Sequence, residues 1–218
     1  MCYNTLMEKQ KELLAYLEEM FPVARCELNY ETPFQLLIAT ILSAQCTDKR
    51  VNMVTPKLFA LAPTPDKMAE LNEDELKDII HSCGFYNSKA KAIKECSREI
   101  VEKYNGEMPT DRDVLQTLSG VGRKTANVVL NECFGFPVVA VDTHVHRVCD
   151  RLGISEEKDS PLEVEKKIYQ AFDKNCLDKL HLRLILFGRY HCISRKPKCE
   201  ECKMQKYCKY YKDKYEHR

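Results

Sequence analysis

The chain has 218 residues, of which 44% are hydrophobic and 31% charged, and its formal net charge at pH 7 is only +1. This length and apolar content allow a sizeable buried core in one domain or in two small ones. With so small a net charge, the chain as a whole has no field that would indicate a nucleic-acid partner. The longest apolar run is too short to cross a bilayer. The first twenty residues mix lysine with glutamate and contain no signal-peptide core, so we expect a soluble, reducing compartment.

Proline and glycine separate a series of short segments with helical spacing, which predicts an all-α fold. Residues 32–35 (Thr-Pro-Phe-Gln) form a capping-box pattern that opens an apolar helix through Ala44, with Gln35 reaching back to the cap. The spacing of apolar residues predicts another helix over 88–104, which the following Asn-Gly pair ends.

The second half of the chain continues this pattern. Two helices are expected over 111–118 and 123–134, joined by a glycine-containing turn. The apolar residues 138–141 are strand-like, but no other segment offers them a partner, so we expect a buried extended connector. Residues 160–163 (Ser-Pro-Leu-Glu) repeat the capping-box pattern and predict a helix to about Lys174.

The turn before residue 123 is the first candidate functional feature. Gly120 and Gly122 let the backbone bend sharply and approach a ligand, and amides at such a turn form a phosphate site. Arg123 and Lys124 place two cations at the positive end of a helix dipole, which costs up to about 1 kcal/mol and which an anionic partner would offset. The alternatives are a tight helix connection for the glycines and a simple phosphate contact for Lys124.

An aspartate, Asp142, follows eighteen residues after Lys124 in a Val-Asp-Thr-His segment. It precedes a helical pattern over 143–152, and Asp is a preferred N-cap residue. Capping is compatible with catalysis, because a cap fixes the position of the carboxylate. A lysine and a carboxylate together can supply a nucleophile and an acid/base.

Twelve cysteines are present, and four of them cluster near the C-terminus. These four are Cys192, Cys199, Cys202 and Cys208, separated by six, two and five residues. Spacing alone allows a zinc site with four thiolate ligands or an iron–sulfur cluster. The other eight share no ligand spacing and are expected to fill the core, namely Cys2, Cys26, Cys46, Cys83, Cys96, Cys133, Cys149 and Cys176.

The same tail is the basic part of the chain, with ten Lys or Arg against four Asp or Glu over 189–218. Three of the cations, Arg195, Lys196 and Lys198, lie between the first two clustered cysteines. A short loop pinned at both ends by metal ligands would be an effective grip on phosphates. A solvated connector is the alternative interpretation.

These features together resemble the endonuclease III family of DNA-repair glycosylases with apurinic/apyrimidinic lyase activity. The turn ending at Lys124, the segment around Asp142 and the four-cysteine spacing carry the resemblance. Stretches at 42–45, 84–89 and 188–190 match as well, so the resemblance covers essentially the whole chain.

The resemblance implies two helical lobes with a DNA-binding cleft between them and Lys124 and Asp142 at its mouth. A six-helix barrel lobe would span 26–136 and contain a helix-hairpin-helix over 111–134. An iron–sulfur cluster lobe would combine 1–25 with 137–218, and its cluster loop would be 192–208. The family's cysteine pattern holds a [4Fe–4S] cluster, which makes zinc the less favoured alternative.

The implied activity is removal of oxidised or damaged pyrimidines and cleavage of the abasic site by β-elimination. The damaged nucleotide would be flipped out of the duplex, because a stacked nucleotide hides its sugar carbon. Lys124 would attack C1′ and form a Schiff base, while Asp142 would stabilise the charge that develops on the sugar and shuttle protons. The amides at Gly120 and Gly122 would hold the DNA backbone.

Two further positions have implied roles, and two positions depart from the family pattern. Gln45 would fill the gap left by the flipped base, and the turn at Phe85 would wedge the duplex. Phe85 stands where a leucine is expected, which bears on lesion and opposite-base preference. In the hairpin, family members often have Leu-Pro-Gly, whereas this chain has Ser119 in the place of the proline.

The expected partner is damaged double-stranded DNA, contacted also by Arg123 and by the three cations of the tail loop. We expect a monomer without a membrane association, in the cytoplasm of a prokaryote-like cell. The alternatives are a monofunctional adenine or mismatch glycosylase and a non-catalytic DNA-binding iron–sulfur protein. The presence of Lys124 and Asp142 favours the strand-cutting enzyme over both.

Overall fold

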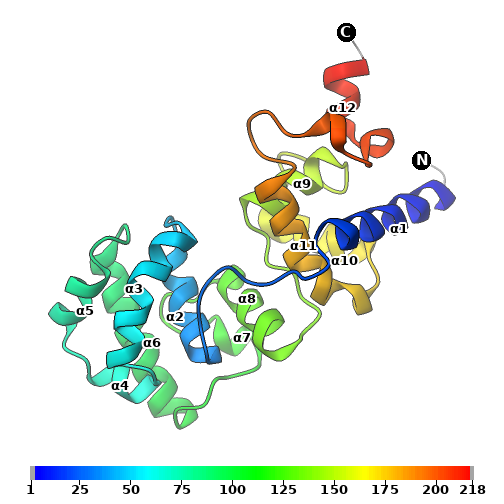
Figure 1. The fold of residues 1–218 in the computed structure, drawn as a ribbon. Coiled ribbons are helices and arrows are strands. Elements are labelled where there is room, and N and C mark those ends of the chain that lie inside the picture. Colours follow the sequence, from blue (N-terminus) through cyan, green and yellow to red (C-terminus); the bar gives the residue numbers. More distant parts are fainter. Residues whose placement is uncertain (1–2, 217–218) are drawn as a thin grey trace. The chain divides into compact units, whose positions relative to one another are not determined.

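The computed structural model describes residues 3–216, and the described chain consists of helices and turns without a strand (Figure 1). This confirms the predicted all-α class. The α-helices are α1 Tyr3–Met20, α2 Pro33–Ser43, α3 Asp48–Leu61, α4 Pro65–Glu70, α5 Glu73–Ile80, α6 Tyr86–Tyr104, α7 Arg112–Leu115, α8 Arg123–Phe134, α9 Thr143–Arg151, α10 Pro161–Ala171, α11 Leu177–Tyr190 and α12 Lys209–Tyr211. Short 3-10 helices span Lys174–Cys176, Cys199–Glu201 and Gln205–Tyr207, and a π-helix spans Lys212–Glu216.

The chain divides into two compact units. One unit is Cys26–Gly135 and contains α2 to α8. The other combines Met1–Arg25 with Phe136–Arg218, so that the first helix of the chain joins its last helices. Within the described residues, no helix has both the length and the apolar character needed to cross a membrane.

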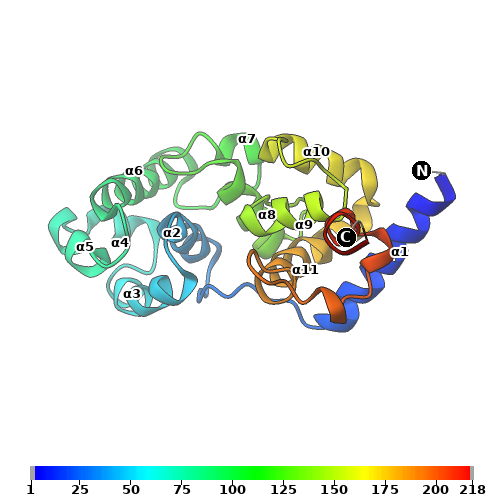
Figure 2. The same cartoon turned by 90° about the horizontal axis from the view of Figure 1, so that it is seen from above.

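Helix α2 is the centre of the Cys26–Gly135 unit. All residues from Phe34 to Leu42 are buried, and the helix packs against α3, α6 and α8 (Figure 2). The hydroxyl of Thr32 accepts a hydrogen bond from the Gln35 amide at 3.2 Å, as the capping pattern predicts. The Gln35 side chain, however, accepts from the backbone N–H of Glu31 at 2.9 Å, one residue beyond the predicted partner.

Helix α8 has the predicted bounds, but its partner α7 is shorter than predicted. The helix expected over 111–118 ends at Leu115, because the next hydrogen bonds span three residues in place of four. The amides of Thr117 and Leu118 donate to the carbonyls of Val114 and Leu115, each three residues back. The Thr117 hydroxyl also donates to the Val114 carbonyl at 2.7 Å and competes with continued helix.

In the other unit, α11 packs against α9 and α1 around a buried apolar core. Gly188 permits the close approach of α11 to α9, because a Cβ there would lie 2.8 Å from the Cβ of His144. The capping box of α10 forms as predicted between Ser160 and Glu163. Helix α10 ends at Ala171 rather than near Lys174, because Phe172 turns extended.

Residues 138–141 form the extended connector that the sequence predicts, and 139–141 are buried. Side chains satisfy its backbone in place of a second strand. The N–H of Val139 donates to the Tyr169 hydroxyl, and the N–H of Ala140 donates to Nδ1 of His181, each at 3.2 Å. The buried N–H groups of Val139 and Ala140 therefore have partners although no second strand is present among the described residues.

Candidate active site and nucleic-acid interface

The hairpin between α7 and α8 carries Lys124 on its outgoing arm. Gly120 has φ +76°, and a Cβ at this position would lie 2.9 Å from the Cβ of Ala92 on α6, so only glycine fits without displacement. Gly122 is the N-cap of α8 and has no side chain with which to cover the first amides of that helix. Lys124 is the second residue of α8 and is exposed. This arrangement combines a phosphate-binding type of turn with an accessible amine.

Asp142 is the N-cap of α9, as the sequence predicts. Its Oδ1 accepts hydrogen bonds from the amides of His144 and Val145, each at 2.8 Å. The side chain is half-buried, so the cap holds the carboxylate in a fixed position that remains partly accessible. Asp142 belongs to the unit with α9, and Lys124 to the Cys26–Gly135 unit.

Gln45 and Phe85 lie on two loops of the Cys26–Gly135 unit that touch each other. A Cβ on Gly84 would lie 3.8 Å from the carbonyl oxygen of Gln45. Both Gln45 (φ 51°) and Phe85 (φ 59°) adopt the left-handed backbone region that non-glycine residues avoid. Both are exposed, and Phe85 exposes 67% of its surface. An exposed aromatic on a strained backbone is typical of a binding element.

Lys89 links the two helices, α2 and α6, that flank these loops. The sequence did not single out this residue. It lies in the first turn of α6, is buried, and its Nζ donates a 2.7 Å hydrogen bond to the carbonyl of Leu42 in the last turn of α2. Burial lowers the pKa of the Lys89 ammonium, and the neighbouring Cys46 and Cys83 act in the opposite sense. The only sequence signal was its place in a stretch that matches the family.

The four clustered cysteines line one cavity together with Arg151, Phe187 and His191. All four thiols are half-buried. Among the described residues, no three His, Cys, Asp or Glu side chains are grouped tightly enough for a single metal ion. Burial raises the pKa of the Cys202 thiol to about 11. The fit to a metal centre rests on the shared cavity, which brings four sulfur ligands together.

Two arginines of α9 hold the start of the cysteine loop. Arg151 is buried and donates to the carbonyls of Ile193 at 2.7 Å and Ser194 at 3.0 Å, and its Nη1 lies 3.5 Å from Sγ of Cys192. Arg147 donates through Nε to the Cys192 carbonyl at 3.1 Å. Beyond these contacts the loop exposes its three cations, Arg195, Lys196 and Lys198.

The remaining cysteines follow the core prediction only in part. Cys83, Cys96 and Cys149 are buried. Four others are only half-buried, namely Cys26, Cys46, Cys133 and Cys176. Cys2 lies outside the described residues.

Two family models match the chain. Residues 38–174 match the HhH-GPD superfamily of base excision DNA repair proteins, and residues 192–208 match the iron–sulfur binding domain of endonuclease III. The second match covers the four clustered cysteines and the cationic loop between the first two.

Curated relatives and solved structures agree with these matches. The chain is 49% identical over 202 residues to endonuclease III of Haemophilus influenzae, covering 93% of this chain and 95% of the relative. It is 50% identical over 191 residues to endonuclease III of Bacillus subtilis, covering 88% and 87%. A solved structure of a trapped endonuclease III–DNA covalent intermediate, an estranged-adenine complex, is 47% identical, with a TM-score of 0.89 and coverage of 94% and 97%.

The helical fold and the matched helix-hairpin-helix region therefore define a base excision DNA repair protein of the HhH-GPD superfamily. Within that superfamily, the chain belongs to the endonuclease III family. It is a bifunctional enzyme, a DNA glycosylase and abasic-site lyase, and its cofactor is a [4Fe–4S] cluster.

Proposed function

We propose that the chain removes damaged pyrimidines from double-stranded DNA and cleaves the abasic site with Lys124 as the nucleophile. The observation that carries the proposal is the exposed Lys124 amine directly behind a hairpin whose Gly120 is seated against α6. The similarity to a trapped endonuclease III–DNA covalent intermediate supports it. An amine that bonds to a sugar carbon yields such an intermediate.

In this proposal the residues of the chain divide the chemistry between them. The damaged nucleotide leaves the base stack, and the neutral Lys124 amine attacks C1′ as the bond to the base breaks. The attached nitrogen then loses a proton and the C1′–O4′ bond breaks, which opens the sugar ring and gives a Schiff base. The Schiff base allows a proton to leave C2′, and the bond from C3′ to its phosphate oxygen then breaks by β-elimination. Asp142, held by its cap on α9, stabilises the positive charge on the sugar and carries protons between these steps.

The surrounding contacts fix the duplex. Gln45 fills the space of the flipped base, Phe85 wedges the stack beside it, and cations and hairpin amides bind phosphates. The proposed DNA-binding residues are Gln45, Phe85, Gly120, Gly122, Arg123, Arg195, Lys196 and Lys198. The contact between the Gln45 and Phe85 loops supports a joint role for them.

We assign the cluster to Cys192, Cys199, Cys202 and Cys208, whose shared cavity supports the assignment. When bound, the cluster's iron supplies the positive charge that four coordinating thiolates require. The chain's own contribution is to hold the loop, through Arg147 and Arg151, in a conformation that presents its cations. We also propose a monomer that acts in the cytoplasm.

The test is a comparison of lesions with purified protein. Duplexes carrying thymine glycol, an intact abasic site, or adenine opposite 8-oxoguanine are incubated in parallel, and strand cleavage is followed. Cleavage of the first two and not of the third is expected. Excision of the adenine without strand cleavage would show a monofunctional mismatch glycosylase instead. Normal binding to the abasic duplex without cleavage would show a non-catalytic DNA-binding protein.

A further inference from the structure

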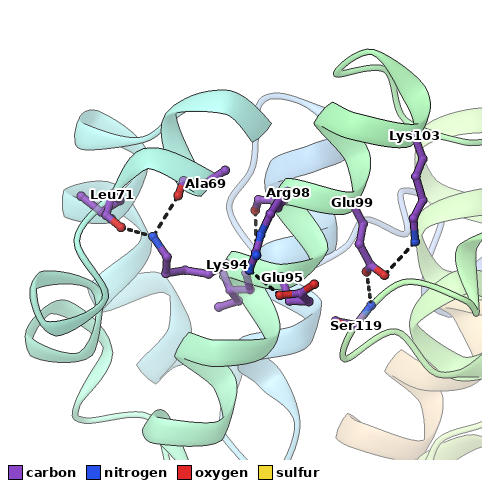
Figure 3. Close-up of polar contacts among 10 residues, drawn as sticks. Ala69, Leu71, Lys94, Glu95, Arg98, Glu99, Lys103 and Ser119 are labelled. Atoms are coloured by element: carbon purple, nitrogen blue, oxygen red, sulfur yellow. Dashed lines mark hydrogen bonds and ion pairs between the residues drawn. The ribbon is translucent and has the colours of Figure 1, made fainter.

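Ser119 is attached to α6 through a backbone hydrogen bond that a proline could not make. Its N–H donates to Oε2 of Glu99 at 2.8 Å, across twenty residues of sequence (Figure 3). Lys103, one helical turn further along α6, contacts the other carboxylate oxygen, Oε1, at 3.1 Å (Figure 3). Both oxygens of Glu99 are therefore occupied, one by the hairpin and one by a lysine.

The environment of Glu99 makes this contact firmer than an ordinary surface ion pair. Its side chain is only 15% exposed, while that of Lys103 is 53% exposed. Burial alone would raise the pKa of Glu99, but the Ser119 amide, the Lys103 ammonium and the Ser119 hydroxyl outweigh it, and the pKa lies below its ordinary value. The carboxylate is therefore charged at neutral pH, and hydrogen bonds to a charged, partly buried acceptor are the stronger kind.

The adjacent residue of the hairpin rests on the same helix. A Cβ on Gly120 would come within 2.9 Å of Ala92, which lies two turns before Glu99 on α6. Two consecutive hairpin residues thus contact α6, one by packing and one by a charge-assisted hydrogen bond. After these two residues the chain passes through Val121 and Gly122 into α8, where Lys124 is the second residue.

A proline at position 119 would restrict the backbone by its ring but has no N–H to donate. This chain has serine there, and it uses the N–H that serine retains. We propose that Glu99 is a positioning residue of the active-site hairpin. Its carboxylate fixes Ser119 on α6 and so restricts the position of Lys124. This contact takes the place of the stiffness that a proline would give the hairpin. This inference rests on the proposed role of Lys124 as the nucleophile.

A double-mutant cycle tests the proposal. Glu99→Ala removes the acceptor, Ser119→Pro removes both the N–H and the hydroxyl of Ser119 as donors, and the double variant removes acceptor and donors together. Glu99→Gln keeps an acceptor, and Glu95→Ala is the matched control, because Glu95 lies on the same helix and pairs with Arg98 instead of the hairpin (Figure 3). The rate of borohydride-trappable adduct formation with a saturating abasic duplex is measured in single turnover, together with the melting temperature.

We expect Glu99→Ala to slow adduct formation about tenfold at a temperature where every variant is folded. Glu99→Gln regains most of that loss, and Glu95→Ala matches the unsubstituted protein. In the Ser119→Pro background, Glu99→Ala slows the reaction no further. An unchanged rate in Glu99→Ala, or effects of the two substitutions that simply multiply, would overturn the proposal.

Amide hydrogen exchange at residues 119–122 provides a second readout that needs neither catalysis nor the proline variant. Exchange is expected to accelerate in Glu99→Ala and not in Glu95→Ala. If the unsubstituted protein forms no adduct at all, the proposed role of Lys124 fails, and the anchoring of the hairpin is decided by exchange alone. Equal exchange in both alanine variants would then refute the anchor.

Discussion

The ammonium of Lys89 and the carbonyl of Leu42 are joined by a 2.7 Å hydrogen bond between the first turn of α6 and the last turn of α2. The last carbonyls of α2 lack partners within the helix. Here the amides of Ala44 and Cys46 donate to the carbonyls of Ile41 and Ser43. The Lys89 ammonium donates to the carbonyl of Leu42. The bond fixes the end of α2, from which the Gln45 loop departs, to the beginning of the helix that follows Phe85.

The first prediction concerns this bond. Lys89→Met retains the length of the side chain but removes the donor, so the Gln45 and Phe85 loops lose their common anchor. We expect excision from a damaged duplex to slow by about threefold to tenfold, a cost in the range of one lost hydrogen bond. Cleavage of an abasic site in single-stranded DNA, where no opposite base is present, remains unchanged.

Lys94→Met is the matched control for that prediction. Lys94 lies on the same helix and donates to the carbonyls of Ala69 and Leu71, away from the Gln45 and Phe85 loops (Figure 3). Its removal affects stability without a preference for duplex substrates. If both lysine variants lose duplex excision and single-strand cleavage in equal measure, Lys89 has no specific role in holding the two loops.

The second prediction separates the two roles of Asp142. Asn is as good an N-cap as Asp, so Asp142→Asn keeps the hydrogen bonds to His144 and Val145 and changes stability by less than about 1 kcal/mol. Asp142→Ala loses the cap and costs about 1 to 2 kcal/mol. Both variants lose about a hundredfold or more in strand cleavage, as expected for loss of acid–base catalysis. Denaturant unfolding and a cleavage assay measure the two effects. Full activity in Asp142→Asn would restrict Asp142 to capping.

The third prediction concerns stability at acid pH. Oδ2 of Asp159 accepts hydrogen bonds at 2.6 Å from the Lys167 ammonium and from the Glu156 amide, and these lower the pKa of Asp159. A lowered carboxyl pKa stabilises the folded state above the pKa of the unfolded chain, near 4, and this contribution disappears as pH falls through the folded value.

Asp159→Asn is therefore expected to lower the melting temperature at pH 7, with the difference from the unsubstituted protein shrinking below about pH 4. Glu70→Gln serves as the control, because Glu70 and Lys67 form an exposed pair of the kind that contributes little. If the melting temperature of Asp159→Asn stays below that of the unsubstituted protein by the same amount down to pH 2, the charge of Asp159 is not what stabilises the fold here.

The fourth prediction concerns the cluster. Cys199→Ser is expected to abolish the brown colour of the protein and to weaken DNA binding, since Arg195, Lys196 and Lys198 lose their rigid support. The salt dependence of binding should decrease, because fewer phosphates are neutralised. Cys176→Ser is the control, since Cys176 is a half-buried thiol outside the ligand spacing. An unsubstituted protein that is colourless and contains one equivalent of zinc would contradict the assignment.

Local signals predicted the features that depend on local sequence. The start of α8 followed from the glycine turn before it, and the cap of α9 followed from Asp142. The same kind of reasoning overextended α7, because the competing hydrogen bond of Thr117 is a side-chain detail that helical periodicity does not register.

The features that the sequence did not reveal are contacts between distant residues. Lys89 and Leu42 are 47 positions apart, and Arg151 and Ile193 are 42 positions apart. In both pairs only folding brings the donor to the carbonyl. Ser119 could be recognised as a departure from the family pattern, but its compensation by Glu99 depends on how the hairpin packs on α6.

Borohydride trapping with an abasic duplex tests the central claim most directly. The unsubstituted protein is expected to form a covalent adduct that maps to the peptide containing Lys124, and Lys124→Gln is expected to form none. Lys198→Gln, which weakens only a proposed phosphate contact, still forms the adduct at saturating DNA. Trapping that persists in Lys124→Gln would contradict the assignment of Lys124 as the nucleophile.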